Sequence, residues 1–435
     1  MRRVAAVLAL LMVLCWWGPA LVQAQGEITV VSQTYDNHFP QDITFHLKAQ
    51  GTQNITKVTF YYRVGSSTSD SYVYPTFTPG LSVQADYVLA TGGAHYIVPG
   101  AVIQYYYQID DATGNQLKTQ PATLTYDDTR FTWQKIQGDQ LAVYWHALQP
   151  VAQQVFQTGQ ATLAKMKSEA GESLARSVKI YVYATKSEMD VALPFQSQTS
   201  TQDIITEGEA FPEADEVMIL GTVQDIAGTT AHELTHLITG QLTSNPFAGI
   251  PTWLNEGLSM YAEGQLRGVN QQALNAGIRG NSLLNLHTIS SLPGRPEDVN
   301  LFYGEAYSVV RYLISAYGSG QMAQLLGTFK QGTKADDALI KVYGFNIDGL
   351  EAKWRASIGA PPAPTAAAQA GQSQAPSVPT IVPFGSNQQG AAPQSPPAAS
   401  PASARNDTVL YGAVAAGLAV LVASFFVGLR LSRRK

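Results

Sequence analysis

The chain has 435 residues, of which 45% are hydrophobic and 14% are charged, and its formal net charge is −5. Its 27 Lys and Arg residues are outnumbered by 32 Asp and Glu, without a basic patch that would suit nucleic acid, so we expect no nucleic-acid partner. The only cysteine, Cys15, excludes a disulfide framework.

Residues 1–24 have the three parts of a secretory signal peptide. Arg2 and Arg3 provide the positive start, residues 4–17 form an apolar run, and residues 22–24 provide a cleavage site. Cys15 lies inside the apolar run, so the exported chain would contain no cysteine. We therefore expect a protein that leaves the cytoplasm and folds without disulfides.

Residues 25–127 alternate apolar and polar side chains, as β-strands do. The clearest runs are residues 27–32, 43–47, 58–64 and 103–109, and turn-rich segments separate them. About seven short strands in roughly 100 residues predict an immunoglobulin-like or fibronectin-like β-sandwich.

Residues 128–358 have the pattern of an α+β domain. We expect a helix over about residues 139–171, a strand at 178–183 and a second strand at 216–220. The next segment carries the most informative motif of the chain.

That motif is His232-Glu233-Leu234-Thr235-His236, and it follows a threonine pair that would suit a helix cap. On an α-helix, residues four apart share a face, so His232 and His236 can bind one metal ion. Glu233 lies beside them, where it can hold and deprotonate a metal-bound water. The motif therefore predicts a catalytic zinc site.

A third protein ligand is expected because catalytic zinc sites usually have three. Glu256 lies twenty residues after His236, in an apolar segment with helical spacing that follows Pro251. We predict that Glu256 completes the ligand set for one Zn²⁺ ion.

The His-Glu-x-x-His motif followed by Trp253-Leu254-Asn255-Glu256-Gly257 resembles the gluzincin metallopeptidases. The sequence is most similar to their peptidase MA-like group and more distantly similar to the M1 aminopeptidases. The resemblance implies a thermolysin-like fold, with His232, His236 and Glu256 as zinc ligands and Glu233 as general base. It also implies that residues 217–220 form the sheet edge along which a peptide substrate binds.

The resemblance reaches a second helix, which begins near Tyr303. By similarity to M1 enzymes, Tyr303 would stabilise the oxyanion with its hydroxyl, and Tyr307 and His287 are alternatives. Tyr303 and Tyr307 also belong to an apolar stripe at helical spacing, so a purely structural role stays open.

Two departures from the related families limit the resemblance. The M1 motif Gly-x-Met-Glu-Asn is absent, so aminopeptidase activity is not supported. Met260 occupies the position where thermolysin-like enzymes have an aspartate that orients the first zinc histidine. The sequence therefore does not identify the residues that support the ligands.

The C-terminal part predicts a tether. Residues 359–407 form a linker rich in Ala, Pro, Gln and Ser, whose composition does not support a folded core. Residues 408–429 lack charge and are long enough to cross a bilayer as one transmembrane helix. The basic tail, residues 430–435, would stay in the cytoplasm.

Together these features predict a zinc metallopeptidase anchored in the cell membrane, with its catalytic domain outside and a peptide or protein as substrate. Two alternatives remain: a non-catalytic surface protein with a vestigial metal site, and a zinc hydrolase that acts on a non-peptide substrate.

Overall fold

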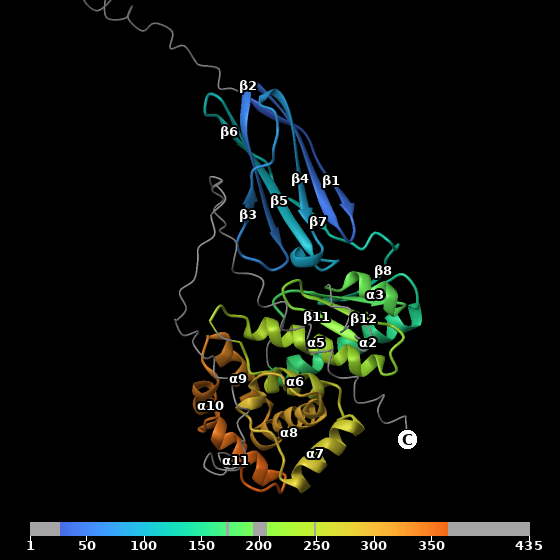
Figure 1. The fold of residues 1–435 in the computed structure, drawn as a ribbon, viewed down its shortest axis with the longest axis vertical. Helices are drawn as coiled ribbons and strands as arrows, with labels where there is room; N and C mark the ends of the chain where they lie inside the picture. Colours follow the sequence, from blue (N-terminus) through green and yellow to red (C-terminus); the bar gives the residue numbers. More distant parts are fainter. Residues whose placement is uncertain (1–26, 171–173, 195–206, 248, 364–435) are drawn as a thin grey trace, which may run out of the picture. The chain divides into compact units, whose positions relative to one another are not determined.

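The computed structural model describes residues 27–170, 174–194, 207–247 and 249–363 (Figure 1). The expected signal peptide, transmembrane helix and basic tail lie outside these residues, as does the linker from residue 364 onward. Among the residues that the structure does describe, no helix has the length and hydrophobicity of a membrane span.

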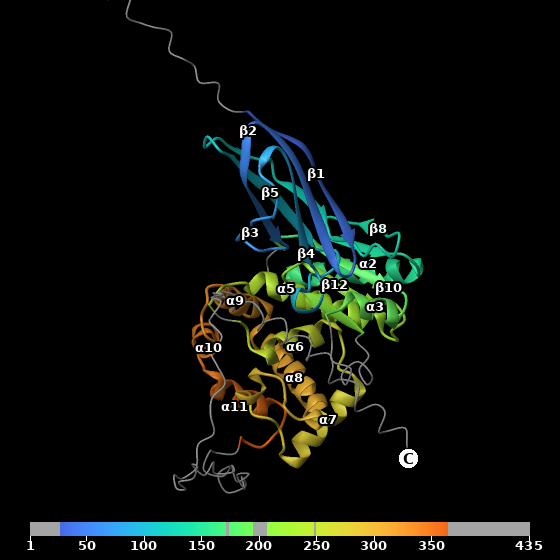
Figure 2. The same cartoon turned by 45° about the horizontal axis from the view of Figure 1, so that its top comes forward.

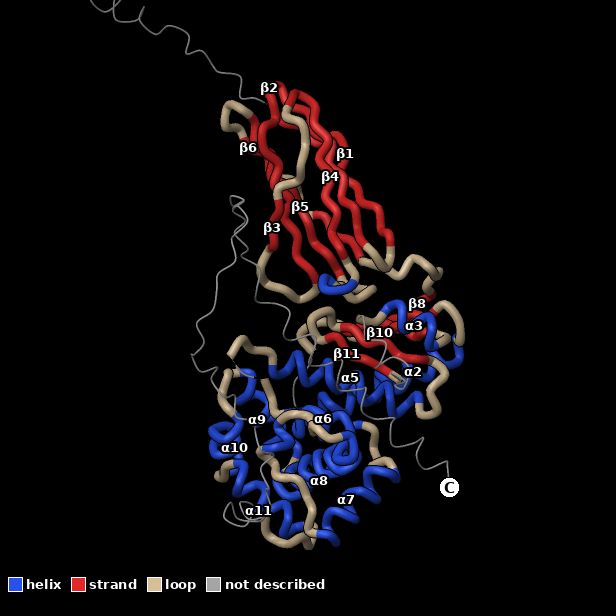
Figure 3. The backbone as a smooth tube through the Cα atoms, in the orientation of Figure 1, coloured by secondary structure: helices blue, strands red, loops and turns tan. Residues whose placement is uncertain are grey.

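The chain divides into two compact units between Phe131 and Thr132. The first unit is rich in β-structure, and the second is an α+β domain whose C-terminal part is helical (Figure 3). The α+β class predicted from the sequence is therefore confirmed.

The N-terminal unit consists of antiparallel strands that form one hydrogen-bonded network. The described elements are β1 (Ile28–His38), β2 (Asp42–Val64), β3 (Ser71–Val73), β4 (Gly80–Ala90), the short helix η2 (Gly93–His95), β5 (Val102–Asp111), β6 (Gln116–Lys118) and β7 (Ala122–Thr125).

Strand β2 connects two groups of strands. Its first half pairs with β1 and β4, its second half pairs with β3 and β5, and the register with β4 shifts between Gln50 and Ile55. Phe45 of the first half packs against Phe60 of the second, with ring centroids 4.7 Å apart. The two halves therefore contribute to one buried core.

The second unit contains one five-stranded sheet and the helices that cover it. Its elements are β8 (Gln134–Gln137), β9 (Leu141–Trp145), α2 (Gln149–Ala170), β10 (Val178–Tyr183), α3 (Lys186–Ala192), β11 (Gly208–Phe211), β12 (Glu216–Leu220), α5 (Ile226–Thr243), α6 (Thr252–Ala262), α7 (Gly268–Gly280), η3 (Thr288–Ser290), η4 (Pro296–Asp298), α8 (Val299–Tyr317), α9 (Ser319–Lys330), α10 (Ala335–Tyr343) and α11 (Ile347–Ser357).

The sheet order is β11-β12-β10-β9-β8, with parallel strands in the centre and an antiparallel strand at each edge. Helices α2 and α5 pack against the sheet, and α6 and α8 lie beyond α5 (Figure 2). Helix α5 is thus enclosed between the sheet and the helical half of the unit, which explains why most of its residues are buried.

Two expectations about this sheet are wrong. The helix predicted from about residue 139 starts at Gln149, because the buried apolar run Leu141–Trp145 pairs as strand β9 beside β10. The strand at residues 217–220 is not the sheet edge, because β11 pairs with its outer side. The edge is therefore the four-residue strand Gly208–Phe211, which is too short to give a clear periodic signal.

Helix α5 begins earlier than the threonine pair suggested. Asp225 is its N-cap and accepts a hydrogen bond from the Gly228 N–H at 2.8 Å. Thr230 lies inside the helix, fully buried, and its hydroxyl donates to the Ile226 carbonyl at 2.6 Å. The cap thus precedes the motif by two helical turns, and the motif lies in the rigid middle of the helix.

Candidate metal centre and active site

Helix α5 brings His232 and His236 together as their spacing predicts. Their Nε2 atoms are 3.1 Å apart, and their side chains are 16% and 13% exposed. Both rings are therefore held by the surrounding protein, yet a ligand can still reach them.

Glu256 of helix α6 supplies a third donor atom at the same place. Its Oε2 lies 3.6 Å from His232 Nε2 and 3.7 Å from His236 Nε2. Donors about 2.0–2.2 Å from a tetrahedral zinc ion lie roughly 3.3–3.6 Å from each other, so this triangle has nearly the required size. The chemistry and spacing of the three residues fit one zinc ion.

Gly257 explains how α6 holds Glu256 in position. A Cβ atom on Gly257 would lie 2.4 Å from the Ala306 carbonyl oxygen and 2.5 Å from a methyl group of Val310. Only glycine allows α6 to pack this closely on α8. The helix that carries the third donor is thereby fixed against the core.

The residues that orient the histidines are Glu263 and Ser259, and sequence reasoning missed both. Glu263 Oε1 lies 2.7 Å from His232 Nδ1, and Ser259 Oγ lies 3.2 Å from His236 Nδ1. Hydrogen bonds of this kind fix the ring orientation and the tautomer of metal-binding histidines. Glu263 thus replaces the aspartate that was sought at Met260, which is buried in the core.

The spacing of Glu263 from Glu256 would have predicted that it lies near the donor residues. It follows Glu256 by seven residues, which is two helical turns, so the two carboxylates lie on the same side of α6. The side chain of Glu263 is 3% exposed, and its Oε2 accepts a hydrogen bond from Arg267 Nε at 3.3 Å. Arg267 also lies 3.7 Å from Glu207, so one guanidinium group serves two carboxylates.

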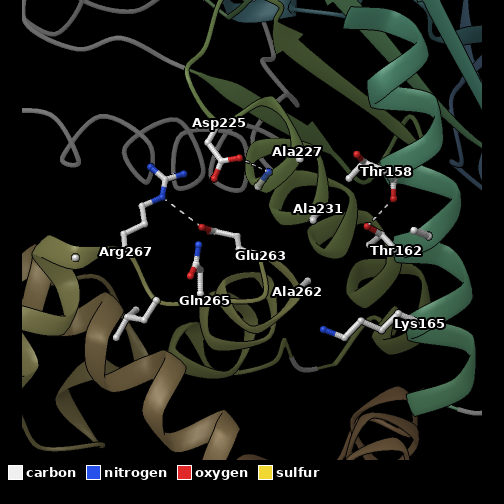
Figure 4. Close-up of a pocket in the computed structure, with 14 residues that line it drawn as sticks. Thr158, Thr162, Lys165, Asp225, Ala227, Ala231, Ala262, Glu263, Gln265 and Arg267 are labelled. Atoms are coloured by element: carbon white, nitrogen blue, oxygen red, sulfur yellow. Dashed lines mark hydrogen bonds and ion pairs between the residues drawn. The ribbon is translucent and has the colours of Figure 1, made fainter.

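Figure 4 shows that Glu263 and Arg267 also line a second cavity, of about 540 Å³, between α2, the start of α5 and the end of α6. Asp225 and Lys165 lie on its walls, and the Asp225 cap and the Glu263–Arg267 contact are drawn as dashed lines. Glu263, which contacts His232, therefore also belongs to the lining of this second cavity.

Glu233 lies beside the donor triangle, with 7% of its surface exposed. Gly208 of β11 contacts it closely, since a Cβ atom on Gly208 would lie 2.6 Å from Glu233 Cγ. Burial raises the pKa of Glu233, and the nearby histidines lower it to a smaller extent. A raised pKa gives this carboxylate the proton affinity that a general base requires.

The donor residues and Glu233 line one cavity of about 170 Å³. Its lining includes His232, Glu233, His236, Glu256 and Tyr303. Burial, followed by the negative charges of Glu256 and Glu233, raises the pKa of Tyr303 well above its usual value. The Tyr303 hydroxyl therefore stays protonated and can donate a hydrogen bond into the cavity.

The two alternatives to Tyr303 are placed differently. Tyr307 is buried one turn later on α8 and is not part of the cavity lining. His287 has a side chain that is 52% exposed and pairs with Asp348 at 2.9 Å, also outside that lining. Tyr303 is thus the one of these three side chains that the fold brings to the metal centre.

Glu209 is a further cavity residue that sequence reasoning missed. It lies on the edge strand β11 and is 6% exposed. Burial and the charge of Glu233 raise its pKa to about 8. Its strand gave too weak a signal to be predicted, so its position next to the motif helix was not evident.

Comparison with known families agrees with this geometry. Residues 158–360 match the sequence model of the Peptidase MA superfamily, a segment that contains both histidines, Glu233, Glu256 and Tyr303. The match supports a peptidase MA-like, gluzincin-type family for this part of the chain, and proteins of this superfamily are usually zinc-dependent. A comparison with curated proteins finds no match.

Several solved structures share short regions of similarity with the chain. A carbohydrate-binding module family 56 β-1,3-glucan binding domain is 21% identical, covers 22% of this chain and 98% of its own, and has a TM-score of 0.15. A GH family 64 laminaripentaose-producing β-1,3-glucanase from Paenibacillus barengoltzii is 16% identical over 27% of each chain, with a TM-score of 0.16. A polysaccharide deacetylase from Bacillus cereus is 11% identical, covers 38% of this chain and 53% of its own, and has a TM-score of 0.18. At these scores the similarities carry no conclusion about ligand or activity.

Proposed function

We propose that the protein is a zinc-dependent peptidase that hydrolyses peptide bonds. The observation that carries the proposal is the triangle of donor atoms from His232, His236 and Glu256, 3.1–3.7 Å apart, beside Glu233 in one cavity. The match to the Peptidase MA superfamily supports the same reaction class.

When bound to the three donors, zinc supplies a Lewis acid that activates water and polarises a carbonyl group. Glu233 removes a proton from the attacking water and returns it to the leaving amine, as its burial and raised pKa favour. Tyr303 donates its hydroxyl proton in a hydrogen bond to the oxygen on which negative charge develops. Glu263 holds His232 with Nε2 facing the other donors.

The decisive variant is Glu233→Gln, which preserves the shape of the side chain and removes the base. We expect one zinc ion per chain by metal analysis, and hydrolysis of a peptide library reduced by about 10²–10⁴-fold. Glu297→Gln, which removes an exposed acid, is the control and should leave both measurements unchanged. His232→Ala should lose the metal as well as the activity.

The same experiment separates the proposal from its alternatives. Substantial activity in Glu233→Gln would refute the assignment of the base. If the wild-type protein binds zinc but cleaves no peptide in a broad library, a non-peptide substrate or a non-catalytic surface role gains support. Absence of bound zinc would favour the non-catalytic role.

We also propose that the peptidase acts outside the cell. Residues 1–24 would direct export, residues 408–429 would anchor the chain, and residues 430–435 would remain in the cytoplasm. Protease added to intact cells should remove the catalytic unit, and deletion of residues 408–435 should release it into the medium. Retention of the truncated chain inside the cell would contradict this topology.

The β-rich N-terminal unit would be an immunoglobulin-like or fibronectin-like module that positions the enzyme. Strand β2 supports this proposal, because its first half pairs with β1 and β4, its second half pairs with β3 and β5, and the two halves share a core. Deletion of residues 27–131 should then change activity on anchored protein substrates while small peptides are still cleaved.

A further inference from the structure

The side chain of Glu209 is buried without a partner for one of its oxygen atoms. It is 6% exposed, and among the described residues Oε2 has no hydrogen-bond partner. An unpaired buried carboxyl group is costly, and native proteins satisfy nearly all such groups. A ligand bound in the cavity would satisfy this oxygen atom.

The charges around Glu209 favour a positively charged partner. Glu233 and Glu213 are the neighbouring charges that act on Glu209, and both are negative. Arg267 is already engaged by Glu207 and Glu263. A substrate cation would offset both the burial of Glu209 and this repulsion.

The position of Glu209 brings such a partner to the reaction centre. Glu209 lines the same cavity as Glu233 and the three donor residues. Its strand, β11, is the last strand of the sheet, and an extended peptide can pair with an edge strand of this kind. A peptide on that edge would pass Glu209 close to Glu233 and the donor residues.

We propose that Glu209 is a specificity residue that recognises a cationic group of the substrate close to the scissile bond. This inference rests on the proposed peptidase function and names the substrate class that it would prefer. The cation is the side chain of a lysine or arginine, which donates charge-assisted hydrogen bonds to a carboxylate.

The test compares kcat/KM of the zinc-loaded full chain on matched peptides. Each pair differs by Lys or Met at one of the positions flanking the scissile bond, and each peptide is made with a free and an acetylated N-terminus. We expect the cationic peptide to be preferred by about tenfold or more, as for one charge-assisted hydrogen bond. Acetylation of the N-terminus should leave this preference intact, and loss of the preference on acetylation would overturn the assignment of a side chain as the bound cation.

Glu209→Gln should lower kcat/KM on the cationic peptide to the value on its neutral partner and so remove the preference. Glu209→Asp, which keeps the charge, should restore part of it. Glu213→Gln removes an equal charge that does not line the cavity and should preserve the preference. A second readout is equilibrium binding of the same peptides to Glu233→Gln, in which cleavage does not interfere.

The outcomes are distinct. Cleavage without a preference for any cation, or a preference that survives Glu209→Gln, overturns the role of Glu209 and leaves the peptidase function standing. If no peptide is cleaved but Glu233→Gln binds cationic peptides through Glu209, the reaction class fails and the recognition role holds. Equal binding of cationic and neutral peptides overturns the recognition role.

Discussion

The contact between Glu263 and His232 offers the sharpest test of how the metal centre is built. Glu263 Oε1 is 2.7 Å from His232 Nδ1, and the carboxylate is 3% exposed. In Glu263→Ala the imidazole loses the acceptor that fixes its orientation. Glu263→Gln keeps an acceptor oxygen at this position and removes only the charge.

The expected magnitude follows from the role of such carboxylates. Loss of a partner that orients a metal-binding histidine typically lowers metal affinity by about 10–100-fold. This corresponds to roughly 1.4–2.7 kcal/mol, at about 1.36 kcal/mol for each factor of ten. Burial of the pair places Glu263→Ala near the upper end, and Glu263→Gln near the lower end because its hydrogen bond remains.

Zinc affinity is measured by competition with a chromogenic chelator, and thermal unfolding in excess chelator checks that each variant still folds. Ser259→Ala is the matched control, since it removes a longer contact of 3.2 Å to the other histidine and should weaken zinc binding less. An unchanged zinc affinity in Glu263→Ala would refute the reasoning, because the contact would then contribute nothing to the site.

Three further predictions concern other parts of the chain. Tyr303→Phe should lower kcat with little change in zinc affinity, because only the hydroxyl is removed; equal loss of kcat and zinc would indicate a structural role. Gly208→Ala should reduce kcat by up to about 10²-fold with zinc retained, because the added Cβ would lie 2.6 Å from Glu233 Cγ and displace the base. Its control is Gly327→Ala, in which the added Cβ would meet nothing within 4 Å. The hydrogen bond to Asp86 raises the pKa of His46 in the folded protein above the usual 6.5. The pair therefore stabilises the fold below pH 6.5, and this stabilisation is lost as the pH rises through the higher pKa of the folded state. The melting temperature of the wild type should therefore exceed that of His46→Gln in mild acid, and a difference that grows with pH would contradict the assignment.

Local signals made much of the site predictable. The spacing of His232 and His236 depends only on helical geometry, and the apolar pattern around Glu256 placed it on a second helix. The same rules would have found Glu263, because it repeats the position of Glu256 two turns later. The contributions of β11 were hidden, since Gly208 and Glu209 belong to a strand of four residues whose pairing is set by β12.

The sequence by itself predicted the three donor residues of the candidate metal centre, because the donor types and their helical spacing are visible in short segments of the chain. It also determined the α+β class, through patterns that extend over whole segments. Only the tertiary structure decided which strand forms the sheet edge, which carboxylate supports His232, and that Tyr303 reaches the cavity while His287 does not. These features depend on contacts between residues far apart in the chain. At Gly208 and Gly257 the packing is so close that it has no room for one additional Cβ atom.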